Sequence, residues 1–162
     1  MGHPMNIIEK HLRRYISPKD KVLDLGCGNK DYSHISNFTT TVDGWEKTNP
    51  YYLLDLERDE LPFEENSFDY ILMIDFIEHL DKDKGKKVLE DCKKIVQDKI
   101  FIFTPLFWDD NSKNAENPRC WAYGNPYDYH KSLWTEKDFS DCILIQKIKF
   151  QMGMTWLGYW KK

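Results

Sequence analysis

Residues 68–74 constrain the fold more than any other segment, because they read Phe-Asp-Tyr-Ile-Leu-Met-Ile. A run this short and this apolar predicts a strand that is buried on both of its faces. Such strands are typical of parallel sheets whose two faces are covered by helices. An amphipathic helix is expected over residues 84–96, where apolar side chains recur at helical spacing.

Further β-rich segments extend this pattern to about seven strands. They cover residues 22–25, 39–42, 52–54, 100–103, 142–150 and 154–160. Helical spacing also marks residues 6–16, and a short helix is expected around residues 30–36. The alternation predicts an α/β fold, a Rossmann-like open twisted sheet that is mostly parallel, with helices on both faces. The last two strands follow each other closely, so an antiparallel C-terminal hairpin is expected.

Length and composition favour one domain over residues 1–162. Residues 1–4 (Met-Gly-His-Pro) are interpreted as an expression scar. The four cysteines are far apart and no Cys/His spacing suggests zinc, which predicts reduced thiols, a cytoplasmic location and no metal site. No apolar run is long enough to span a bilayer. The net charge of −4 argues against a nucleic-acid partner.

The chemistry is expected at the strand ends, because ligands of open α/β sheets bind outside the carboxyl ends of the strands. Gly26 and Gly28 follow the strand at residues 22–25, and their lack of Cβ atoms allows a ligand to approach the backbone. The dinucleotide fingerprint requires a third glycine where Asp31 stands, which argues against NAD. A phosphate-binding Gly-x-x-x-x-Gly-Lys-Ser/Thr loop is also missing from the sequence.

Aspartates end the next strands along the chain. Asp43 could accept hydrogen bonds from both hydroxyls of a ribose, and Asp55 could accept one from an adenine amino group. Carboxylates near the glycine turn would also favour a cationic ligand. A ligand with ribose, adenine and a positive charge but no phosphate is therefore expected, and S-adenosylmethionine meets these conditions.

Three motifs make the resemblance specific. Residues 22–28 (Val-Leu-Asp-Leu-Gly-Cys-Gly) resemble the glycine-rich motif of class I S-adenosylmethionine-dependent methyltransferases. Residues 61–70, followed by Ile-Glu-His-Leu at 77–80, resemble the region around the fourth strand in the small-molecule branch of that family. Residues 130–139 resemble its segment after the fifth strand, so the resemblance covers about residues 20–140.

The resemblance implies a methyltransferase that uses S-adenosylmethionine and acts on an oxygen or nitrogen of a small molecule, which could contain a sugar. Position by position, it implies a methionine site at Asp24, Gly26, Cys27 and Gly28. It further implies a ribose site at Asp43 with Gly44 and Trp45 beside it, an adenine site at Asp55 and Leu56, and contacts beneath the cofactor from Asp75 and Phe76.

His130 is the candidate general base, with Asp128 as its orienting group or its alternative. Histidine titrates near neutrality and can accept a substrate proton. The alternative is a loop histidine that bonds only to backbone. Glu78 and His79 could be catalytic, but the favoured interpretation is that they cap or brace the following helix and the sheet. The aromatic side chains of residues 105–134 are expected to form a small local core, with some faces turned to a substrate.

Two other functions stay open. The stretch between Gly28 and Val42 is short, and the helix usual between the second and third strands is missing from the pattern. A non-catalytic S-adenosylmethionine-binding module or partner subunit is therefore the alternative. A second copy of the chain, in a homo-oligomer, or a different chain could supply the missing part that normally covers the substrate. A nucleic-acid methyltransferase is disfavoured by the charge and by the lack of an amino-methylation motif. Asn125-Pro126-Tyr127 resembles the Asn-Pro-Pro-Tyr motif of amino-methylating enzymes, but that motif follows the fourth strand, whereas this triplet follows the fifth and is interpreted as a turn.

Overall fold

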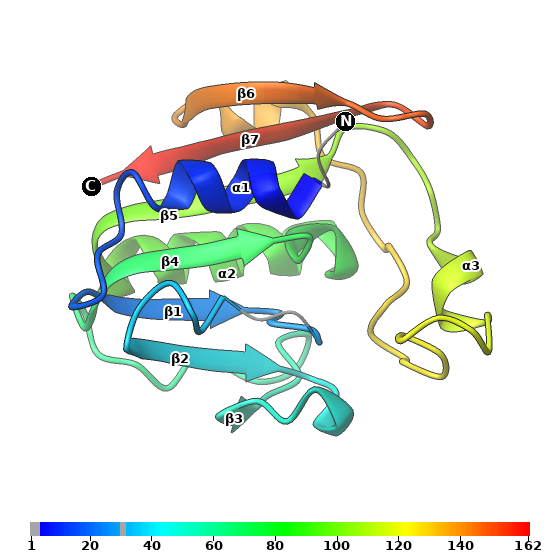
Figure 1. The fold of residues 1–162 in the computed structure, drawn as a ribbon, viewed down its shortest axis with the longest axis horizontal. Coiled ribbons are helices and arrows are strands. Elements are labelled where there is room, and N and C mark those ends of the chain that lie inside the picture. Colours follow the sequence, from blue (N-terminus) through cyan, green and yellow to red (C-terminus); the bar gives the residue numbers. More distant parts are fainter. Residues whose placement is uncertain (1–3, 30–31) are drawn as a thin grey trace.

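A seven-stranded sheet runs through the centre of the molecule in the order β3-β2-β1-β4-β5-β7-β6 (Figure 1). The computed structural model describes residues 4–29 and 32–162. The strands are β1 (Lys21–Leu25), β2 (Phe38–Asp43), β3 (Tyr52–Leu53), β4 (Phe68–Ile74), β5 (Val96–Pro105), β6 (Ile143–Lys149) and β7 (Met154–Lys161). Strands β1 to β5 pair in parallel, whereas β7 pairs antiparallel with β5 and β6. The predicted Rossmann-like sheet with an antiparallel C-terminal hairpin is confirmed.

Two helices cover opposite faces of the sheet (Figure 1). They are α1 (Pro4–Leu12) and α2 (Lys82–Ile95), close to the predicted helices, while α3 (Ser112–Ala115) lies beyond the carboxyl ends of the strands. Residues 1–3 of the expected expression scar lie outside the described residues, and Pro4 opens α1. Within the described chain, no helix is both long and apolar enough to cross a membrane.

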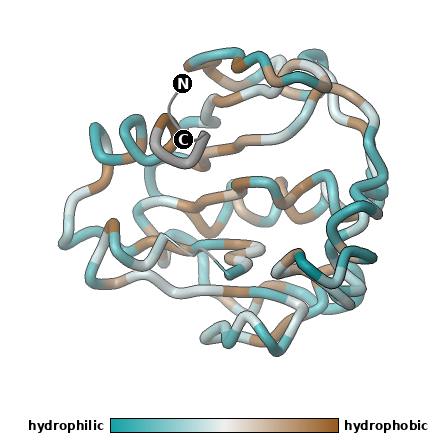
Figure 2. Tube along the Cα trace, turned by 45° about the vertical axis from the view of Figure 1, so that its right-hand side comes forward, coloured by the Kyte–Doolittle hydropathy of each residue, from teal (hydrophilic) through white to brown (hydrophobic). Residues whose placement is uncertain are grey.

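Strand β4 is buried on both faces, as its sequence predicts. Ile71 and Met73 belong to the core under α2, and Leu72 and Ile74 belong to the core under α1. This alternation follows from the two-residue period of a strand. The hydrophobic residues accordingly concentrate in the central strands, while the peripheral loops are largely hydrophilic (Figure 2).

The connections between the first three strands contain little helix. The predicted helix at residues 30–36 is wrong for its described part, because residues 32–35 form a bend and a turn and residue 36 is irregular. There the backbone N–H of Tyr32 donates to the Asp24 carboxylate at 3.0 Å, and Tyr32 and Ile35 are buried. Between β2 and β3 stands only a 3₁₀ turn at Glu46–Thr48. The carboxyl ends of β1, β2 and β3 therefore remain accessible.

Candidate functional site

A cavity of about 480 Å³ lies at the carboxyl ends of the parallel strands. Strand β1 pairs with β2 on one side and β4 on the other, which makes this the point where the strand order reverses. The predicted site residues that line the cavity are Asp24, Gly26, Cys27, Gly28, Asp43, Gly44, Asp55, Leu56, Asp75, Phe76, Asp128 and His130. Trp45 is the predicted site residue that lies outside this lining.

The turn after β1 requires glycine for two reasons. Gly26 and Gly28 have φ angles of +69° and +57°, in the left-handed region that favours glycine. A Cβ on Gly26 would lie 2.4 Å from the Phe76 ring. The backbone N–H groups of Gly26 and Cys27 both donate to the Val42 carbonyl, at 2.8 and 3.2 Å. The turn is thereby fixed against β2, with its backbone next to the cavity.

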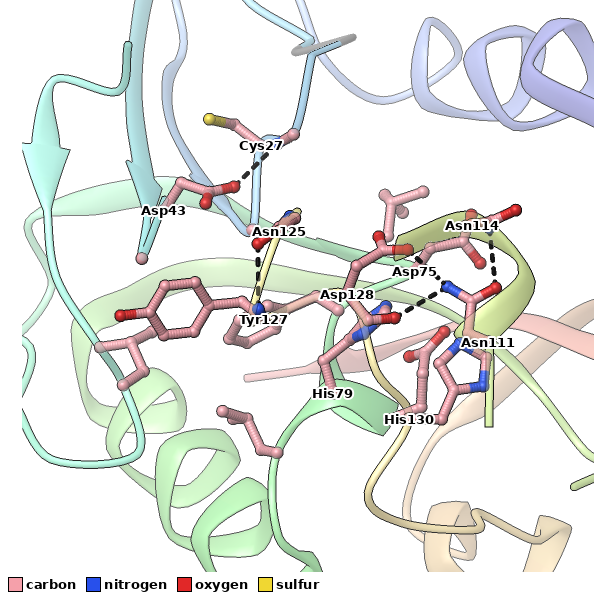
Figure 3. Close-up of a pocket in the computed structure, with 18 of the residues that line it drawn as sticks. Cys27, Asp43, Asp75, His79, Asn111, Asn114, Asn125, Tyr127, Asp128 and His130 are labelled. Atoms are coloured by element: carbon pink, nitrogen blue, oxygen red, sulfur yellow. Dashed lines mark hydrogen bonds between the residues drawn. The ribbon is translucent and has the colours of Figure 1, made fainter. Parts of the chain in front are cut away.

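Asp43 links the end of β2 to this glycine turn (Figure 3). Its Oδ2 accepts a hydrogen bond from the Gly28 N–H at 2.9 Å, and its Oδ1 accepts one from the Trp45 N–H at 2.8 Å. Burial raises the pKa of Asp43, although these N–H groups oppose the rise. Each carboxylate oxygen retains lone-pair capacity for a further donor. Trp45 thus contributes its backbone to the site, and its ring faces Trp121 at a centroid distance of 6.2 Å.

The other aspartates at the strand ends are held in different ways. Asp24 is buried and accepts the hydrogen bond from the Tyr32 N–H. Asp55 closes a turn by accepting from the Glu57 N–H at 3.1 Å. That turn places the buried Leu56 against the cavity. Asp55 and Leu56 therefore form the part of the cavity wall that follows β3 in the chain.

Asp75 ends β4 in a strained conformation. Its φ of +49° is unusual for a residue other than glycine, and its N–H donates to the Phe103 carbonyl at 2.9 Å. Such strain commonly gathers at functional sites. The residue keeps an accessible surface, and it lines the cavity. Burial, followed by the charge of Asp128, raises the pKa of Asp75 to about 7.

Residues 106–135 form a covering segment that passes over the carboxyl ends of the strands (Figure 1). Asn111 Nδ2 donates to the main-chain carbonyl and to Oδ2 of Asp128, at 2.8 and 2.9 Å. The Tyr127 N–H donates to Asn125 Oδ1 at 2.9 Å, which confirms a turn there (Figure 3). The Tyr127 ring lies against Gly44, where a Cβ would be 3.0 Å from it.

The aromatic residues of the covering segment do not form one local core. Trp134 is buried and stacks on Phe139 at 5.5 Å within the main core, whereas Trp108 and Tyr123 are exposed. Trp121 reaches the cavity. The segment is held over the site chiefly by its buried asparagine and aspartate side chains.

The two candidate catalytic residues face the same cavity (Figure 3). Burial, followed by the charge of Asp43, raises the pKa of Asp128 to about 6. Burial lowers the pKa of His130, although the backbone and carboxylate of Asp109 oppose this. Asp128 is therefore largely ionised and His130 largely neutral at pH 7, so either group can accept a proton.

Glu78 and His79 lie closer to the cavity than the sequence indicates. The Glu78 carbonyl accepts from the Lys131 and Ser132 N–H groups, at 2.9 and 3.1 Å, so it braces the covering segment. Its Oε2 accepts from Thr104 Oγ1 of β5 at 3.0 Å, so the side chain also braces the sheet, as expected. The His79 ring meets His130 edge-on at a centroid distance of 4.8 Å. Burial lowers the pKa of His79 to about 4. Glu78 and His79 both line the cavity. The contact between His79 and His130 is visible only in the folded chain.

The cavity fits a cationic nucleoside better than a phosphate. Its walls carry carboxylates from every parallel strand end between β1 and β4, and the only lysine or arginine among its described lining residues is Lys131. The Lys131 Nζ is paired with Glu57 at 3.0 Å. The volume of the cavity falls within the range of small-molecule sites, roughly 300–1,000 Å³. S-adenosylmethionine, with a sulfonium charge and no phosphate, suits this lining.

Comparison with known proteins agrees with this geometry. Residues 23–103 match the family of methyltransferase domains, and the chain therefore belongs to the class I S-adenosylmethionine-dependent methyltransferases. The fold resembles a SAM-dependent methyltransferase from Archaeoglobus fulgidus, with a TM-score of 0.65, 16% identity, and coverage of 97% of this chain and 94% of that one. Among curated proteins, none matches the sequence.

Two further solved structures share the fold. One is 1,6-didemethyltoxoflavin-N1-methyltransferase from Burkholderia thailandensis, with a TM-score of 0.60, 14% identity, and coverage of 97% of this chain and 75% of that one. The other is the complex of the Haloferax volcanii Trm112 methyltransferase activator with a methyltransferase, with a TM-score of 0.60, 14% identity, and coverage of 94% and 86%. The predicted enzyme class, methyltransferase, and the predicted cofactor, S-adenosylmethionine, are confirmed.

The glycine turn yields a stability prediction. Gly26→Ala places a Cβ against Phe76 in a left-handed conformation, whereas Gly124→Ala meets open space at a φ of +76°. The Gly124 variant should lose roughly 1–2 kcal/mol for the left-handed backbone alone. The Gly26 variant should lose clearly more in urea unfolding monitored by circular dichroism. Equal losses would contradict the close contact with Phe76.

Proposed function

We propose that this chain transfers the methyl group of S-adenosylmethionine to an oxygen or nitrogen of a small-molecule acceptor, including acceptors that carry a sugar. The observation that carries the proposal is the continuity of the cavity. It extends from the glycine turn, past Asp75, to Asp128 and His130. Cofactor-binding and proton-accepting groups thus share one enclosure of small-molecule size.

The cofactor end of the cavity is assigned from the strand ends. Asp43 would accept the ribose hydroxyls, with Gly44 and the Trp45 backbone beside it. Asp55 and Leu56 would bound the adenine. When bound, S-adenosylmethionine supplies a methyl group that its sulfonium already activates.

The remaining cofactor contacts come from β1 and β4. Asp24, Gly26, Cys27 and Gly28 would line the methionine part of the cofactor. Asp75 and Phe76 would lie beneath it, since both line the cavity at the end of β4. The acidic side chains there favour the positive charges of this ligand.

The acceptor end needs a group that orients the nucleophile and one that removes its proton. Positioning supplies much of the rate in such a transfer. Asp128 is fixed by Asn111, and His130 is fixed through its main chain by Asp110, whose carbonyl accepts its N–H at 3.1 Å. We assign the proton-accepting role to this pair.

The proposal includes the setting of the enzyme. Residues 1–162 would form one cofactor-binding domain. The four cysteines, none of them in a disulfide within the described structure, favour a reducing, cytoplasmic compartment. A second subunit, either another copy or a different chain, would pack on the exposed Trp108 and Tyr123 of the covering segment. The activator complex of the Haloferax volcanii methyltransferase offers an analogy.

Light scattering together with a turnover assay tests this second subunit. A protein that is monomeric by light scattering and that methylates an acceptor without any other chain would exclude it.

Turnover tests the proposed function. The protein is incubated with S-adenosylmethionine and a panel of hydroxylated and aminated small molecules, and formation of S-adenosylhomocysteine is followed. An acceptor that accelerates this formation supports the proposal, and Asp128→Asn should then lower kcat by about 10²–10⁴-fold. The variant should bind S-adenosylhomocysteine as the wild type does. A panel without any acceptor-dependent product would contradict the proposal.

The pKa of Asp43 yields a pH prediction. The ionised carboxylate is the form that accepts ribose hydroxyls, and its pKa is raised by burial. Affinity for S-adenosylhomocysteine should therefore be greatest near neutral pH and should fall as the pH falls through that raised pKa. Asp43→Asn should bind more weakly at neutral pH and lose most of this dependence, as measured by calorimetric titration at several pH values. Parallel pH profiles for the two proteins would contradict the assignment.

A further inference from the structure

Three metal-ligating side chains meet at the acceptor end of the cavity. Glu78, His79 and His130 each offer a ligand atom, and these atoms all lie within 4.8 Å of one another. Figure 3 shows His79 and His130 side by side near Asp128. Ligands bonded to one ion at about 2.0–2.2 Å lie roughly 3 Å apart, so small side-chain rotations would complete the set.

A buried oxygen at this cluster has no hydrogen-bond partner within the described part of the chain. Glu78 is 1% exposed, and its Oε2 accepts a hydrogen bond from Thr104 Oγ1 at 3.0 Å. Among the residues that the structure describes, no donor reaches Glu78 Oε1. A buried polar atom without a partner is costly, and a carboxylate oxygen more so. A cation bound at Oε1 would remove this cost.

Surrounding contacts already orient the ligands. His79 Nδ1 lies 3.3 Å from the Tyr129 carbonyl, and donation of Nδ1–H to this oxygen leaves the Nε2 lone pair for another partner. Such a bond from the second ring nitrogen to a carbonyl or carboxylate accompanies most metal-binding histidines. The N–H groups of Lys131 and Ser132 donate to the Glu78 carbonyl, which ties the segment that carries His130 to the segment that carries the other two ligands.

We propose that Glu78, His79 and His130 bind one divalent transition-metal ion whose open coordination positions face the acceptor. Two imidazoles with a carboxylate favour first-row transition ions over Mg²⁺ and Ca²⁺. Three protein ligands leave positions for water or substrate. The sequence predicts no metal site because no Cys/His spacing suggests one and His130 is far along the chain from Glu78 and His79. This proposal replaces that prediction.

The role of the ion toward the acceptor rests on the proposed function, whereas metal binding itself does not. An ion here would bind an acceptor hydroxyl, lower its pKa and fix its position. His130 would then be a ligand, because its lone pair is committed to the metal. Asp128 would remain as the group that receives the acceptor proton.

Metal titration tests the site directly. The full chain, freed of metal with a chelator, is titrated with Mn²⁺ followed by electron paramagnetic resonance, and with Zn²⁺ by calorimetry. The wild type should bind one ion per chain, with Mg²⁺ much weaker. His130→Ala and Glu78→Gln should each lower the affinity by at least about 100-fold, beyond the loss typical of an outer-shell change. His34→Ala, which removes a half-exposed histidine paired with Glu9, should bind as the wild type does.

Two readouts separate this proposal from the proposed function. His130→Ala should keep its affinity for S-adenosylhomocysteine, which shows that it is folded, and Asp43→Ala should keep its affinity for Mn²⁺. Metal binding that survives without any methyl transfer would uphold the site and contradict only the role toward the acceptor. A wild type that binds neither Mn²⁺ nor Zn²⁺, or variants that bind them unchanged, would overturn the proposal.

Discussion

The Asp43 carboxylate holds the glycine turn of β1 against the end of β2, and the geometry of the cavity depends on this contact. Its two oxygens accept N–H groups from Gly28 and Trp45, which come from different connections. The Val42 carbonyl reinforces the contact by accepting from two N–H groups of the same turn. These bonds hold a turn in left-handed conformation that no helix supports directly, because residues 29 and 32–37, between the turn and β2, form no helix.

A second constraint is the closure of the cavity by a segment with little regular structure. The covering segment satisfies its polar groups through buried side chains, and Asn111 bonds both the main chain and the carboxylate of Asp128. Glu78 anchors the same segment through its carbonyl. Buried polar networks of this kind fix a single arrangement when all their members are paired. Among the described residues, Oε1 of Glu78 is a buried atom of this region without a partner, and it is therefore informative.

The cavity has acidic walls, and desolvation by the surrounding protein shifts the pKa values of its groups. Burial raises the pKa of Asp75 and Asp128 and lowers that of His79 and His130. Each shift disfavours the charged form of the isolated group. A cationic ligand would offset the cost for the carboxylates, since an opposite charge nearby favours their ionised form.

Much of the fold could be predicted from the sequence, because local patterns encode it. The apolar run of β4 and the glycine turn after β1 each carry their signal within a few residues. The strand ends then follow from the topology, which places the predicted lining residues together. The pairing of His79 with His130 could not be predicted, because it depends on how the covering segment folds back. The prediction of a helix at residues 30–36 was wrong in its described part. There the Tyr32 N–H donates a hydrogen bond to the Asp24 carboxylate, and a short connection must return to β2.

The central claim is that the strand ends form the cofactor site. Calorimetric titration of S-adenosylhomocysteine into the wild type and into Asp43→Ala tests this claim most directly. Asp141→Ala, which changes a half-exposed aspartate paired with Lys93, is the matched control. The wild type and the control should bind one ligand per chain with equal affinity, and Asp43→Ala should show little or no binding. A wild type that binds neither S-adenosylhomocysteine nor S-adenosylmethionine, or an Asp43 variant that binds as well as the control, would contradict the account.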